Sequence, residues 1–100
     1  MQDLVALYLR AQNLEQVERT DEAVELYEKA VAAAFDAAGP YDRLIAIYTE
    51  RAAFADVARV AEAASRTVRT FDDKRAWYQS VADQARRSSA TSREHRGAEF

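Results

Sequence analysis

The chain has 100 residues, of which 49% are hydrophobic and 31% charged, with a formal net charge of −3 and no cysteine. This composition fits one globular domain with a thin core, and it excludes disulfides, thiolate metal sites and cysteine nucleophiles. No apolar run approaches the ~20 residues of a membrane span. The opening MQDLVALYLR lacks the basic start of a secretory signal, so we expect a cytoplasmic protein with no membrane contact.

Five segments carry apolar residues at helical spacing, which predicts an all-α fold of about five helices. The first covers residues 4–17, with Asp3 as its N-cap. The second begins at Thr20 or Asp21, either of which can cap it, and its apolar stripe continues to Phe35.

Gly39-Pro40 is expected to end the second helix and begin the third. Glycine tolerates the left-handed conformation after a helix, and proline fits a first turn because its missing N–H has no helical partner there. The third segment runs from Tyr41 to Tyr48 and the fourth covers residues 54–68. Two alanines between them leave room for a tight turn but contain no helix breaker.

Aspartates after Phe71 mark a further break, and a fifth segment follows to about Arg87. Its predicted packing face consists of Ala76, Trp77, Ser80, Val81, Gln84 and Ala85. The remaining stretch is polar, which is typical of a disordered tail. We therefore expect a helical domain over residues 1–87 and a tail over 88–100.

The first two segments share an apolar pattern with the third and fourth. When the sequence is shifted so that Leu7 falls on Tyr41, the two stripes overlay, and Ala11 falls on Ile45, Ala23 on Val57 and Ala30 on Ala64. A period of about 34 residues made of two helices resembles the tetratricopeptide repeat. The resemblance covers roughly residues 4–70, and the fifth segment is similar to the terminal helix that caps such arrays.

The second unit carries the resemblance best, through Tyr41, Leu44, Ile45, Tyr48, Phe54, Val57, Ala61 and Ala64. In the first unit, Ala23, Tyr27 and Ala30 match the signature of the second helix. Arg10 departs from the pattern because it stands where a leucine is expected. The resemblance implies antiparallel helix hairpins stacked as a short superhelix, in which the small residues let a neighbouring helix approach and the ring of Tyr27 fills the gap.

No constellation of residues indicates catalysis, a cofactor or a metal. The only histidine, His95, lies in the tail, and no glycine-rich phosphate loop or nucleophile elbow is present. The abundant carboxylates have no partner at metal-ligand spacing, so they indicate a solvated acidic face. We expect a protein that is not an enzyme and needs no cofactor.

The resemblance implies that the first helix of each pair lines a concave groove that receives peptides. The matching positions are Tyr8, Gln12, Glu15, Gln16, Asp42, Arg43, Ala46, Thr49 and Glu50. Some relatives hold a partner's C-terminal carboxylate with lysines and asparagines, but here Asp42 and Ala46 stand at such places. This departure favours a peptide with basic residues. The leading hypothesis is a non-enzymatic adaptor that binds a protein or peptide.

Two other hypotheses remain open. Self-association is expected if the apolar edge of the first helix, formed by Leu4, Val5 and Leu9, meets another copy. Contact with nucleic acid is disfavoured by the acidic overall balance. It would use the basic half: residues 1–50 hold four basic and ten acidic side chains, whereas residues 51–100 hold ten and seven. Its basic set is Arg66, Arg69, Lys74, Arg75, Arg86 and Arg87. The two halves could also attract each other.

Overall fold

The computed structural model describes the backbone of residues 3–68 and 72–98, and the side chains of residues 3–68 and 74–90. Within these ranges the chain forms five helices and no strand, so the predicted all-α fold is confirmed. The helices are α1 (Leu4–Gln16), α2 (Thr20–Ala32), α3 (Gly39–Glu50), α4 (Phe54–Thr67) and α5 (Asp72–Ala98). No helix in the described part of the chain is long and apolar enough to cross a bilayer.

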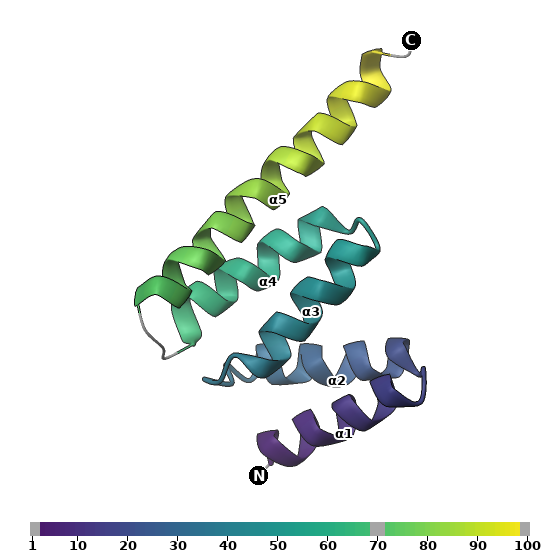
Figure 1. Cartoon of the computed structure of the whole chain (residues 1–100), viewed down its shortest axis with the longest axis vertical. Coiled ribbons are helices and arrows are strands. Elements are labelled where there is room, and N and C mark those ends of the chain that lie inside the picture. Colours follow the sequence, from purple (N-terminus) through teal and green to yellow (C-terminus); the bar gives the residue numbers. More distant parts are fainter. Residues whose placement is uncertain (1–2, 69–71, 99–100) are drawn as a thin grey trace.

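The helices follow one another through space in chain order, from α1 at the bottom of Figure 1 to α5 at the top, and each packs mainly on its neighbours in the sequence. Helices α1 and α2 form one hairpin, and α3 and α4 form a second. Hydrogen bonds between side chains also join alternate helices: α1 to α3, α3 to α5, and α2 to α4. The stack therefore has a front layer, which we define as α1, α3 and α5, and a back layer of α2 and α4.

Three turns between helices share one geometry, centred on Glu18, Ala34 and Ala52, which all have positive φ (62°, 57° and 55°). In each turn the next residue donates its N–H to a carbonyl five residues back, at 2.8 Å from Arg19 to Leu14 and at 2.8 Å from Ala53 to Tyr48. This pattern is the Schellman motif, usually completed by glycine. The turns that close the two hairpins, at Glu18 and Ala52, are separated by the same number of residues as the predicted period of the apolar pattern.

The small residues around Tyr27 lie in the core of the stack. Ala23, Tyr27 and Ala30 have no exposed surface, and Tyr48 is only 9% exposed. Burial of one such aromatic side chain stabilises the fold by about 2–3 kcal/mol. Both rings point into the stack, as the pattern of small and aromatic residues predicts.

Gly39 has a different role from the one expected. Helix α2 ends at Ala32, and the residue with left-handed φ after it is Ala34. Gly39 is the first residue of α3, and its φ is not positive. A Cβ at Gly39 would lie 2.4 Å from Cζ of the Tyr8 ring. The glycine is needed because an aromatic ring from α1 rests on its backbone, and the sequence-based assignment of Gly39 as a helix-ending residue was wrong.

The predicted N-cap is confirmed for α1 and wrong for α2. Asp3 caps α1, its Oδ1 accepting from the N–H groups of Val5 (3.1 Å) and Ala6 (3.2 Å). The N-cap of α2 is Arg19, which makes no side-chain capping bond. Asp21 instead accepts a 2.7 Å bond from Arg51, at the end of α3.

The packing face of α5 is rotated from the predicted one. Tyr78, Ala82 and Ala85 are buried against the stack, whereas Trp77 is 43% exposed. Ala76, Ser80 and Gln84 are exposed as well. Ala85 is the last buried residue among the described side chains, and the domain boundary at residue 87 stays a prediction. The helical backbone continues to Ala98, and the disordered tail stays a prediction.

Candidate binding face

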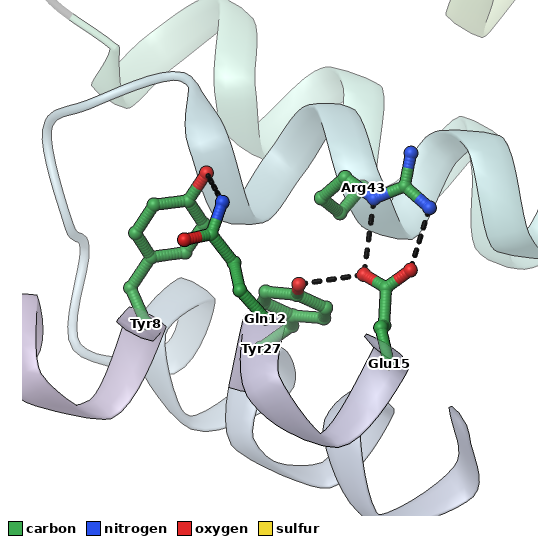
Figure 2. A network of polar contacts seen from close by, with 5 residues as sticks. All are labelled: Tyr8, Gln12, Glu15, Tyr27 and Arg43. Atoms are coloured by element: carbon green, nitrogen blue, oxygen red, sulfur yellow. Dashed lines mark hydrogen bonds and ion pairs between the residues drawn. The ribbon is translucent and has the colours of Figure 1, made fainter. Parts of the chain in front are cut away.

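A polar network joins α1 to α3 on the front layer (Figure 2). Glu15 accepts bonds from the Tyr27 hydroxyl at 2.6 Å and from Arg43 at 3.0 Å (Nε) and 2.6 Å (Nη2). One turn away, Gln12 donates to the Tyr8 hydroxyl at 2.9 Å. The two-point contact of guanidinium with carboxylate fixes the orientation of both side chains.

Charge and burial in this network shift the pKa values of Glu15 and Tyr27 in opposite directions. The hydrogen bonds from Arg43 lower the pKa of Glu15, because they favour its charged form. Burial, followed by the bond to the Glu15 carboxylate, raises the pKa of Tyr27 far above its ordinary range. At neutral pH Glu15 is therefore ionised and Tyr27 is a neutral donor, which is the combination that the geometry needs.

A second cluster joins α3 to α5. Asp42 accepts a 2.6 Å bond from the Tyr78 hydroxyl and forms a 3.1 Å ion pair with Lys74. The Lys74 ammonium lies 4.2 Å from the ring centroid of Trp77, which is within cation–π range. Burial and the Asp42 carboxylate raise the pKa of Tyr78, so its hydroxyl remains a donor. The cluster holds an exposed tryptophan in a defined position.

The ion pairs between helices share one direction: the acid lies on the earlier element and the base on the later one. The pairs are Glu15 with Arg43, Asp21 with Arg51, Glu28 with Arg59, Asp42 with Lys74 and Glu62 with Arg86. The pairs made by Asp21, Glu28 and Asp42 join the acidic first half of the sequence to the basic second half, whereas the other two pairs lie within one half. Each exposed pair contributes up to about 1 kcal/mol, so these contacts set register more than stability.

A groove of about 260 Å³ opens where α5 passes the end of α3 and the start of α4. Its lining residues are Thr49, Phe54, Val57, Val81, Gln84, Ala85 and Ser88. Trp77 stands one turn before Val81 on the same side of α5, since residues four apart on a helix are neighbours. The front layer thus carries an exposed aromatic ring beside a mostly apolar hollow, to which α4 contributes Phe54 and Val57.

The residues predicted to line a peptide groove fall on the front layer, with one at its margin. Arg43, Ala46, Thr49 and Glu50 are all exposed along α3. Asp42, Gln12 and Glu15 are half-buried by the contacts described above. Tyr8 is held between the Tyr27 ring, at 6.0 Å between centroids, and the Phe35 ring, at 6.5 Å. Gln16 is exposed as the last residue of α1.

The three residues of the predicted apolar edge of α1 do not lie on one side of the helix. Val5 and Leu9 are 57% and 52% exposed, and Val17 at the end of the helix is 63% exposed. Leu4 is half-buried beside Phe35 and Val68, on another side of the helix.

Sequence reasoning missed the contribution of α5. Lys74, Trp77, Tyr78 and Val81 complete the front layer. A signal was present in Tyr78, Ala82 and Ala85, because they place one tyrosine and two alanines on one side of a helix, as Ala23, Tyr27 and Ala30 do in another order.

The basic set considered for nucleic acid is partly used within the fold. Lys74 pairs with Asp42, and Arg86 pairs with Glu62 and Asp83. Arg69 and the side chain of His95 lie outside the described residues.

No family model matches the chain, and no curated protein or solved structure matches it either.

Proposed function

We propose that the chain is a non-enzymatic adaptor of tetratricopeptide-like architecture that binds a protein or peptide on its front layer. The observation that carries the proposal is the exposed Trp77 ring held beside an apolar groove. Tryptophan and arginine are the residues most often responsible for binding energy in protein interfaces. A cytoplasmic location, expected from the sequence alone, is part of the same proposal.

Preorganisation of the front layer supports this proposal. Glu15 and Arg43 hold each other on one side of α3, while Asp42 and Lys74 do so on the other. Side chains already held in place lose less conformational entropy when a partner docks. Glu50 is exposed at the end of α3 and forms no ion pair within the described residues, which favours a partner with basic residues.

The repeat architecture is supported by the equal turns at Glu18 and Ala52, one repeat period apart, and by the two-layer order of the helices. Ile45, which carries the resemblance in the second unit although it is larger than the residue usual in the family, is buried in α3.

The adaptor proposal is tested by panning a random-peptide display library on the purified chain. Enriched peptides should lose affinity at least tenfold for Trp77→Ala and for Val81→Lys, and keep it for Gln79→Ala, a control at an exposed position on another side of α5. If no peptide is enriched, or if the three variants bind the enriched peptides alike, the front layer is not a peptide-binding face.

A second candidate function is self-association. The exposure of Val5, Leu9 and Val17 on one helix favours it, because apolar side chains gathered on a surface often mark an interface.

A further inference from the structure

The outer side of α1 carries no charged side chain, although nearly a third of the chain is charged. It is formed by Val5, Ala6, Leu9, Asn13, Gln16 and Val17, all of them exposed. The exposed positions of α2 differ, since they include Asp21, Glu22, Glu25 and Lys29. A neutral, partly apolar helix surface at the end of a stack has the composition of a helix–helix contact.

Two charges of opposite sign border this surface on the same edge. Asp3 lies at the start of α1 and Arg10 lies seven residues later, which is two helical turns. Arg10 is exposed and forms no ion pair with any described residue. Asp3 uses only Oδ1 for capping, so its second oxygen can accept another donor.

We infer that a second copy of this chain docks antiparallel on the outer side of α1, with Asp3 of each copy paired to Arg10 of the other. In this arrangement a two-fold axis passes between the two copies of α1 at the level of residues 6 and 7. The axis keeps Asp3 and Arg10 of both copies on the same edge of the interface. It therefore creates two equivalent Asp3–Arg10 ion pairs, one at each end. The same alignment of the two helices places Val5 of one copy within one residue of the position opposite Leu9 of the other copy. Charge and apolar complementarity thus select a single pairing, as an isologous interface requires.

A longer overlap along α1 would bring the two Arg10 side chains close together, so like-charge repulsion disfavours it. Two turns of helix bury less surface than a stable dimer needs, so the association is weak and concentration-dependent. This inference rests on self-association, the second candidate function, and is independent of peptide binding.

Sedimentation equilibrium at concentrations up to about 1 mM measures the dimer directly. Arg10→Asp and Asp3→Arg should each weaken the dimer about tenfold, because each replaces two attractions by two repulsions. An equimolar mixture of the two variants should recover wild-type affinity, since one chain then carries two bases and the other two acids. Arg75→Asp, a matched change on α5, should leave the dimer unaltered.

Asp3→Arg also removes the N-cap of α1, so Asp3→Asn is measured beside it; asparagine caps a helix as well as aspartate does. It should weaken the dimer a few-fold with unaltered circular dichroism. A wild-type chain that stays monomeric at every concentration would overturn both this pairing and the self-association function. A dimer that withstands both charge reversals would overturn the pairing and leave self-association standing.

Discussion

The contact between the Tyr8 ring and the backbone of Gly39 joins α1 to α3 and can be probed by adding a single methyl group. Gly39→Ala places a Cβ 2.4 Å from Cζ and 2.5 Å from the hydroxyl oxygen of the ring. The ring cannot swing away freely, because it packs between Tyr27 and Phe35 and accepts a hydrogen bond from Gln12. The added methyl group must therefore separate the two helices or break these contacts.

Two opposing effects set the magnitude. Overpacking costs about 1–3 kcal/mol. Alanine has the higher helix propensity, which returns at most about 1 kcal/mol. We expect Gly39→Ala to lower the free energy of unfolding by about 1–2 kcal/mol, which for a domain of this size lowers the melting temperature by about 4–8 °C per kcal/mol.

Urea unfolding followed by circular dichroism, in a double-mutant cycle with Tyr8→Ala, isolates the cause. When the ring is absent, Gly39→Ala should be neutral or slightly stabilising, giving a coupling energy of about 1–3 kcal/mol between the two positions. A wild-type chain stabilised by Gly39→Ala, or equal losses in both backgrounds, would refute the close approach of ring and backbone.

Three further predictions concern the turns, the core and the polar network. Ala52→Gly should raise the free energy of unfolding by about 0.5–1 kcal/mol because it relieves left-handed strain, whereas the control Ala55→Gly, inside α4, should lower it by about as much; thermal melts that show both changes as destabilising would contradict the turn geometry. Ala30→Leu should cost about 1–3 kcal/mol in the same melts, and an unaltered or raised melting temperature would exclude tight packing there. Because the bonds from Arg43 lower the pKa of Glu15 below its ordinary value of 4.5, the stability from this carboxylate is present above pH 4.5 and is lost as the pH falls through the lowered pKa. Glu15→Gln should therefore destabilise the chain at pH 7 and weaken its acid sensitivity between pH 7 and pH 3 in urea melts; equal slopes for both proteins would be inconsistent with the network.

The helices and their order could be predicted from the sequence because apolar spacing and small residues report local structure and packing directly. The burial of Tyr27 and Ala30 followed from that spacing together with the resemblance to a helical repeat. The pattern failed where a tertiary contact outweighs a local preference. A glycine before a proline is typical of a helix end, but Gly39 must be glycine because the Tyr8 ring of the other hairpin lies against it. The left-handed conformation after α2 is adopted by Ala34, which is not a glycine.

The candidate site was predictable on α1 and α3 and only partly on α5. Asp42 stood among the expected groove residues, but its partners Tyr78 and Lys74 lie on α5, beyond the whole of α4 in the sequence, and no local pattern links them. The face of α5 was assigned from apolar periodicity, which favoured Trp77. The structure leaves that ring exposed and buries Tyr78, whose hydroxyl is satisfied by Asp42.

The most direct test of the account is a map of amide shifts in the isotope-labelled chain during titration with a peptide enriched in the library. The account predicts that perturbed amides cluster on the front layer, around Arg43, Thr49, Trp77 and Val81, with the exposed surface of α2 unaffected. Perturbations centred on α2, or shifts spread evenly over all five helices, would contradict the assignment of the front layer as the binding face.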